Sequence, residues 1–209
     1  MMMKRWQRLT VFLRPLLKRE KETMSDILER LDKLKERIQE KDFLEGKGLS
    51  NEVNIHIFCY DPKDEMAVRF FTEQLVSDQD LRCHVVEKNL YRVFLEICEE
   101  NDFLDEIPGA EETMEREEFL EQIAEFADSK VVAEKISDEP LSEGDVILIT
   151  GVGEAYPFIR VHAVLDAIQP DITDNIPIVV LYPGSFNGRE MKLFNKLNPD
   201  GYYRAFNSI

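Results

Sequence analysis

Two loops in the last third of the chain carry residue types that could do chemistry. The first, Gly151-Val-Gly153, follows the apolar run Val146–Ile149 and precedes a helical pattern, as a phosphate-binding loop would. It lacks the third glycine of the dinucleotide fingerprint and the Gly-Lys-Ser/Thr of a P-loop, and residues 144–170 contain no lysine. Because Glu154 would also repel a phosphate, we interpret the glycines as a tight turn that needs a positive φ or a close backbone approach.

Arg160 and His162 follow this loop and could supply a cation and a general base. Two residues apart on a helix, they point to different faces, so at most one of them faces the loop. No nucleophile is evidently paired with His162, and Ser185 lies in Gly-Ser-Phe-Asn-Gly, which differs from the Gly-x-Ser-x-Gly elbow of hydrolases. We therefore expect no enzyme and no cofactor. A small nucleotide-binding or hydrolytic protein that uses Gly151–His162 stays open as an alternative.

The cysteines and histidines do not form a metal-binding pattern. Cys59, Cys83 and Cys98 are odd in number and show no CxxC spacing, which favours reduced, buried thiols of a cytoplasmic protein. His56 and His84 lie in apolar strand patterns, so we expect two core histidines, each with one satisfied ring nitrogen. A zinc site needs more ligands at closer spacing, and we expect no metal.

Charge and composition divide the chain into two parts. The 209 residues carry a net charge of −16, whereas residues 1–23 hold seven basic and two acidic residues, a net of +5. The remaining chain, at −16 − 5 = −21, would repel phosphates, so we expect no direct DNA binding by the protein alone. A capping box of Asp26 and Glu29 follows Met24. We therefore treat 1–23 as a dispensable basic extension and 24–209 as one domain. No apolar run is long enough for a membrane span.

The elements that must position these loops follow an alternating pattern. Helical and apolar periodicities predict four strands, separated by helices, before the C-terminal tail. This order predicts an α/β fold with an open, mostly parallel sheet and helices on both faces. The predicted strands are Val53–Tyr60, Leu81–Glu87, Val146–Thr150 and Ile178–Tyr182.

An acidic segment separates the second and third predicted strands. Residues 96–143 contain 18 acidic and three basic residues, yet Phe119, Ile123 and Phe126 keep a helical spacing. We interpret the segment as a solvated helical insertion that lies against the sheet. A docking surface for a basic partner is the alternative.

After the fourth strand, the sequence predicts turns and short elements. Tyr182-Pro-Gly184 has the residues of a type II turn, and residues 191–197 show the pattern of a short helix. The aromatic-basic tail, Tyr202–Phe206, predicts an edge strand or a packed tail. A DNA-contacting subunit that stacks these aromatic side chains on bases is a further alternative.

The two loops should meet at one end of the sheet, because consecutive parallel strands end at the same edge. Gly151–Arg160 and Tyr182–Gly184 would then lie side by side. Tyrosine and arginine dominate interface hot spots, so we expect a compact partner-binding patch. Its candidate residues are Tyr156, Arg160 and Tyr182.

Several spaced segments of the chain resemble the BrxB family of BREX (bacteriophage exclusion) phage-defence systems. The segments are Gly151–His162, Leu181–Gly184, Asn187-Gly188, Leu193-Phe194 and Tyr202–Phe206, and the resemblance extends from about Met24 to the C-terminus. The resemblance also identifies family-signature positions in this chain, and it assigns no role to them. These are Gly151, Gly153, Pro157, His162, Pro183, Gly184, Tyr203, Arg204 and Phe206.

The resemblance implies membership of a phage-defence complex. Its other components include the alkaline-phosphatase-like protein PglZ, the adenine-specific DNA methyltransferase PglX and the AAA+ ATPase BrxC. We expect a non-enzymatic adaptor that acts through protein–protein contacts, with PglZ as the first-choice partner, then PglX and BrxC.

Overall fold

Strand β4 lies in the middle of a six-stranded sheet, with β3 on one side and β1 on the other. The sheet order is β2-β3-β4-β1-β6, and all of these pairs are parallel; β5 pairs with β4 in the antiparallel direction. The strands are β1 (Ile55–Tyr60), β2 (His84–Asn89), β3 (Asp145–Thr150), β4 (Ile178–Phe186), β5 (Met191–Leu193) and β6 (Phe206–Asn207).

The computed structural model describes residues 26–46, 54–138, 140–168, 176–188 and 190–197, and the backbone of 206–207. Three predictions fall wholly or partly outside these residues: the extension 1–23, the tail positions Tyr203 and Arg204, and the side chain of Phe206. Among the described helices, none is long and apolar enough to cross a membrane.

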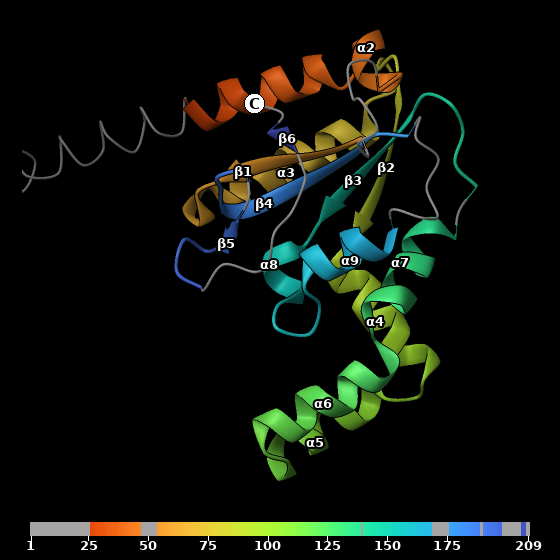
Figure 1. Cartoon of the computed structure of the whole chain (residues 1–209), viewed down its shortest axis with the longest axis vertical. Helices are drawn as coiled ribbons and strands as arrows, with labels where there is room; N and C mark the ends of the chain where they lie inside the picture. The colour runs from red at the N-terminus through yellow and green to blue at the C-terminus, as the bar shows by residue number, and fades with distance from the viewer. Residues whose placement is uncertain are drawn as a thin grey trace, which may run out of the picture.

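The first face of the sheet is covered by the N-terminal helix and by α3 (Figure 1). Helical residues 26–37 bury Ile27, Leu31 and Leu34, and α3 (Glu65–Ser77) buries Val68 and Leu75. The short α2 (Lys41–Leu44) buries only Phe43, and a 3-10 turn, Pro62–Asp64, leads into α3. These apolar stripes are what hold both helices against the sheet.

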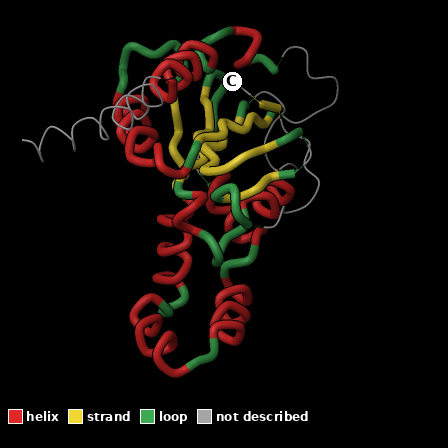
Figure 2. Tube along the Cα trace, turned by 90° about the vertical axis from the view of Figure 1, so that its left-hand side faces the viewer, coloured by secondary structure: helices red, strands yellow, loops and turns green. Residues whose placement is uncertain are grey.

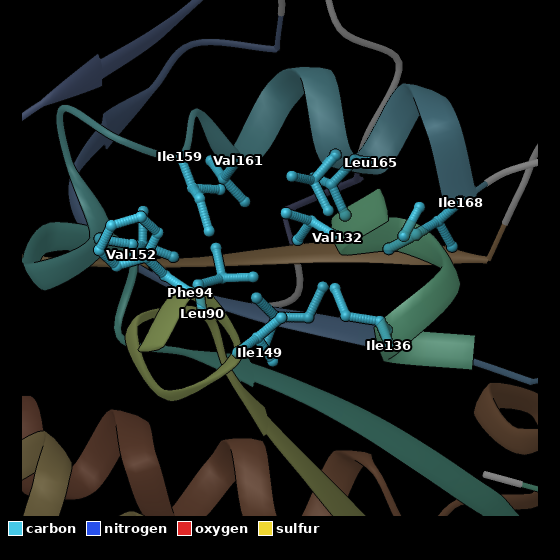
Figure 3. Packing of buried hydrophobic residues seen from close by; sticks show 14 of the residues in the cluster. Leu90, Phe94, Val132, Ile136, Ile149, Val152, Ile159, Val161, Leu165 and Ile168 are labelled. Atoms are coloured by element: carbon cyan, nitrogen blue, oxygen red, sulfur yellow. The ribbon is translucent and has the colours of Figure 1, made fainter. Parts of the chain in front are cut away.

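The opposite face is covered by four helices. Figure 3 shows Val161, Leu165 and Ile168 of α9 pointing toward Val132 and Ile136 of α7. In the same cluster, α4 contributes Leu90 and Phe94. The helices of this layer are α4 (Leu90–Glu100), α7 (Ser129–Ser137), α8 (Val152–Ala155) and α9 (Val161–Ile168). The predicted open α/β sheet with helices on both faces is confirmed.

An acidic arm, formed by α5 (Ile107–Thr113) and α6 (Arg116–Phe126), projects away from the sheet (Figures 1 and 2). It lies between β2 and β3 in the chain, as predicted, and the 3-10 turn Leu104–Glu106 precedes it. The last helix of the insertion, α7, packs against α4 and α9, and α6 reaches the body through Phe119, whereas the rest of the arm projects, so the expectation that the insertion lies against the sheet holds for only part of it. Helical periodicity predicts a buried stripe but not the element that covers it.

Two predictions near the C-terminal part of the sheet are wrong. Pro183 and Gly184 do not form a type II turn, because β4 continues through both residues to Phe186. Residues 191–193 are strand β5 rather than a helix, and Phe194 and Asn195 then turn the chain with φ values of 55° and 58°. Gly184 lies opposite Leu193 in the ladder, so the glycine serves close strand approach instead of a turn.

The two strand histidines differ in their surroundings. His56 is 8% exposed, and its Nε2 lies 2.7 Å from Oδ1 of Asn54, so the prediction of a satisfied core histidine is confirmed. The same prediction is wrong for His84, whose side chain is 75% exposed and lies beside Asp145 at 3.2 Å. The predicted strand began three residues too early, at Leu81 rather than His84, and so placed His84 inside the apolar pattern.

Substitution of Gly184 by alanine should destabilise the protein. A Cβ atom at this position would lie 2.3 Å from the backbone oxygen of Lys192, so β5 would have to move away from β4. We expect a loss of about 1–3 kcal/mol in the free energy of unfolding, measured by urea denaturation. The matched control is Gly109→Ala, because no atom lies within 4 Å of a Cβ there. Equal stability of the two variants would contradict the observed close approach of β4 and β5.

His56 should make the protein less stable in mild acid. Burial, followed by the charge of Arg37, lowers the pKa of His56 from 6.5 to about 4. The unfolded chain therefore binds a proton that the folded chain does not, and stability falls as the pH drops below 6.5 toward 4. We expect a loss of about 2 kcal/mol from about pH 7 to pH 5, absent in His56→Gln. The exposed His84→Gln variant should keep the parent's pH dependence, and a parent-like slope in His56→Gln would contradict this account.

Candidate functional site

A cleft of about 220 Å³ lies at the carboxyl ends of β1, β2 and β3, between α3, α4 and α8. This is the position where open α/β sheets usually bind ligands. Tyr60, Asn89 and Thr150, the last residues of the three strands, line its floor. The charged lining residues are Glu65, Arg69, Glu73, Glu87, Arg92 and Glu154.

The polar groups of the cleft are largely engaged with one another. The guanidinium of Arg69 pairs with Glu65 at 2.8 Å and with Glu154 at 2.9 Å. The hydroxyl of Tyr60 donates to Glu65 at 2.6 Å, and burial together with this carboxylate raises the pKa of Tyr60 well above its ordinary value. The hydroxyl of Thr150 donates to Glu87 at 2.6 Å. The cleft therefore holds a network of Tyr60, Glu65, Arg69 and Glu154, beside the separate Thr150–Glu87 hydrogen bond.

Such a cleft is poorly suited to phosphate. Its carboxylates outnumber its cations, so its field repels anions. The helix that follows Gly151, α8, has only four residues, Val152–Ala155, and it carries Glu154 in its first turn. The residues that line the cleft include no histidine and no lysine.

Close packing explains why glycine occupies positions 151 and 153. Gly151 has φ of +69°, and a Cβ there would lie 2.5 Å from Oδ1 of Asn89, the oxygen that accepts hydrogen bonds from the first backbone amides of α4. A Cβ on Gly153 would lie 2.9 Å from the ring of Phe194 and 3.2 Å from Pro183. The two glycines thus let the loop after β3 lie close to Asn89, Pro183 and Phe194, as the interpretation of a tight turn with close approach predicted.

The cysteines are not a reactive site. All three are free thiols, and Cys83 and Cys98 are buried. Burial raises the pKa of Cys59 and of Cys98 to about 11, and that of Cys83 above its ordinary value. The thiols are therefore protonated at neutral pH. Among the described residues, no group of histidine, cysteine and carboxylate side chains is arranged to hold a metal ion.

A second hollow lies beneath the acidic arm. It is a largely apolar groove of about 280 Å³ between α6, the start of α7 and the α8–α9 connection. Arg160 and Asp128 are its charged residues, and Arg160 is exposed. The apolar part includes Leu120, Ala124, Val132, Pro157, Phe158 and Val164. We call this hollow the arm groove.

Aromatic stacking fixes the α8–α9 connection and therefore the arm groove. The ring of Phe158 stacks on Phe94 of α4, with centroids 4.7 Å apart and planes at 1°. Phe158 also meets Phe119 of α6 edge to face, at 6.2 Å and 84°. Phe119 in turn lies 6.3 Å from Phe103, at the base of the arm. One ring thus connects the loop, the body and the arm, and such aromatic pairs add stability beyond their buried area.

The predicted patch of Tyr156, Arg160 and Tyr182 is not assembled on one surface. Gly153 and Pro183 do bring the two loops side by side, but Tyr182 is only 3% exposed and packs in the core. Tyr156 is half-buried and packs against that core, while Arg160 faces the arm groove. His162 is half-buried in α9, and Pro157 lines the groove. Sequence reasoning missed the α6 and α7 side of the groove, because no local pattern predicts which loop an arm will cover.

Fold and site together define an open α/β protein with a helical arm and a strand-end cleft in which carboxylates are in excess. Residues 86–208 match the family model described as BREX protein BrxB. A BREX protein BrxB of Bacillus cereus (strain H3081.97) is 37% identical over 194 residues, which cover 89% of this chain and 99% of that protein. A BREX protein BrxB of Escherichia coli O9:H4 (strain HS) is 27% identical over 185 residues, 86% of this chain and 90% of that protein.

The chain belongs to the BrxB family, as its motifs predicted, and is a component of a BREX phage-defence system. No solved structure matches it. The family-signature residues Gly151, Gly153, Pro183 and Gly184 lie where the two strand-end loops contact each other or a neighbouring strand. Their contacts account for these residue types without a ligand.

Substitution of Gly151 should test its packing role. Gly151→Ala places a Cβ against Asn89 as well as forcing a strained positive φ, so it should also weaken the cap of α4. The matched control is Gly144→Ala, which has φ of +96° but no atom within 4 Å of a Cβ. We expect Gly151→Ala to lose about 1 kcal/mol more in the free energy of unfolding than the control. Equal losses would show that Asn89 does not depend on the glycine.

Proposed function

We propose that this protein is a non-enzymatic adaptor that binds another BREX component through the arm groove. The observation that carries the proposal is the largely apolar groove beside an exposed arginine, Arg160, held in place by the Phe158 ring stack. Preformed apolar hollows with a charged side chain at the rim are typical anchor sites of protein interfaces. Tyr156, half-buried next to the groove loop, and Arg160 are the proposed contact residues of this surface.

The arm contributes charge to the proposed interface. Most exposed residues of α6, the helix that forms one side of the groove, are acidic: Glu117, Glu118, Glu121 and Glu125. A partner that inserts an apolar side chain into the groove would meet this acidic helix with its own basic residues. We propose PglZ as the first-choice partner, followed by PglX and BrxC, with 24–209 as the functional domain in the cytoplasm.

The nucleotide-binding or hydrolytic alternative has less support. It would place a phosphate at Gly151, where Arg69 already pairs with Glu65 and Glu154 and where the carboxylates are in excess. A nucleotide would have to displace these pairs, and no lysine in 144–170 would replace them. The DNA-contacting alternative depends on Tyr203 and Arg204, which lie outside the described residues.

Truncation at the arm groove should reduce partner binding without unfolding the protein. We expect Arg160→Ala and Tyr156→Ala each to weaken capture of the partner by about 2 kcal/mol, roughly 30-fold in Kd. Because Arg160 is exposed, its truncation should cost about 0.5 kcal/mol or less in folding stability. Pull-down yield with purified PglZ, PglX and BrxC and melting temperature are measured on the same preparations.

The matched control is Arg92→Ala, an exposed arginine at the rim of the strand-end cleft. It should leave capture unchanged. If Arg92→Ala abolishes capture while Arg160→Ala does not, the cleft rather than the groove is the interface. If Arg160→Ala lowers capture only in proportion to a lost folded fraction, Arg160 has a structural role and the proposal fails.

A further inference from the structure

The outer face of α3 carries two large apolar side chains in solvent. Met66 is 74% exposed and Phe70 is 60% exposed, and both lie on the side opposite the buried Val68, Phe71 and Leu75. Residues four apart are neighbours on a helix surface, so Met66 and Phe70 form one contiguous patch. A surface helix normally keeps its outer face polar, and paired exposed apolar residues mark interaction sites.

The surroundings of this patch are acidic. Residues 61–80, which include α3 and both of its ends, hold six acidic and two basic residues. Both basic residues are already paired with carboxylates: Lys63 with Asp61 at 3.1 Å, and Arg69 with Glu65 and Glu154. Glu73 lies one turn beyond Phe70 on the same side and is exposed. The patch is therefore an apolar stripe within a negative field.

The negative charge around the Met66 and Phe70 patch indicates which kind of partner it can bind. A second copy of the chain, packed on α3 about a two-fold axis, would bring acidic groups against acidic groups, and like charges oppose such a contact. A partner helix with apolar residues at three- and four-residue spacing and flanking lysine or arginine complements both the stripe and the field. The 13 residues of α3 make a helix about 20 Å long, on which Met66 and Phe70 lie about one turn apart and Glu73 follows on the same side.

We propose that the outer face of α3, centred on Met66 and Phe70, docks a basic amphipathic helix of a second BREX protein. The inference rests on the proposed adaptor function, in which another partner binds the arm groove. Helix α3 lies on the face of the sheet opposite α9 and the arm groove (Figure 1). The two surfaces thus lie on opposite faces of the sheet, an arrangement that suits the binding of two partners at once. A protein with both surfaces can join two BREX components, whereas a protein with a single such surface can bind only one component at a time.

Photo-crosslinking identifies what covers this face. The full chain with Phe70→p-benzoyl-phenylalanine is assembled with the other components of its BREX system, each purified separately, and irradiated. We expect a crosslinked peptide from one component, with apolar residues at helical spacing and an excess of lysine and arginine. A crosslink only to a second copy, only to residues 1–23 of the same chain, or to nothing would overturn the proposal.

Two variants of α3 test the apolar contribution and the charge contribution to binding, each by its Kd for the component that crosslinks to residue 70. Met66→Ala combined with Phe70→Ala should raise its Kd at least about tenfold at unchanged melting temperature. Glu73→Lys should raise the Kd about three- to tenfold and reduce its salt dependence. The matched control Glu111→Lys, an exposed residue of α5 that does not line the arm groove, should leave this Kd unchanged.

The Arg160→Ala variant separates this inference from the proposed function. It should lose the partner of the arm groove and keep the partner of α3. If Arg160→Ala loses its partner while the α3 variants bind as the parent does, the α3 proposal fails and the adaptor proposal stands. If the α3 variants lose a partner and Arg160→Ala loses none, α3 is a docking face and the arm groove is not.

Discussion

The structure depends on β4 being buried on both faces while it pairs with β1, β3 and β5. Val179 and Leu181 pack under α3 and the N-terminal helix, and Ile178 and Val180 pack under α9 and its neighbours. A parallel strand in this position needs apolar residues on both sides and partners on both edges. Beyond Tyr182 the strand continues with Pro183 and Gly184; the missing Cβ of Gly184 lets β5 approach, and the missing Cβ of Gly153 lets the α8 turn approach Pro183. The strand-end loops meet because β4 extends this far.

This arrangement brings packing residues and paired side chains to the strand-end region. The position that binds ligands in many open α/β sheets is occupied here by packing glycines, by the Asn89 cap and by paired side chains around Arg69. The loops position the α8–α9 connection instead, and Phe158 joins that connection to the acidic arm. The surfaces with spare apolar area then lie away from the cleft, at the arm groove and on the outer face of α3.

The sequence predicts the parts of this structure that follow from local patterns. The bounds of α4, the strand β3 and the role of Gly151 all follow from periodicity and from the backbone freedom of glycine. Pro183 and Gly184 look like a turn because both residues are common in turns, and only pairing with β5 explains them in a strand. The position of the cleft follows from the fold class, but its contacts could not be predicted, since Glu87 and Thr150 are 63 residues apart and meet only through the register of β2 and β3. The direction of the acidic arm is likewise a tertiary property.

The central claim is that this protein joins BREX components without chemistry of its own. Its most direct test is reconstitution from purified PglZ, PglX, BrxC and this protein, with complexes sized by mass photometry in the presence and absence of the chain. The account predicts that two components which remain separate on their own form a single species when this protein is added, with a mass that includes all three. If no pair of components is joined, or if the protein alone turns over ATP or a phosphodiester in a way that Glu154→Gln abolishes, the adaptor account is contradicted.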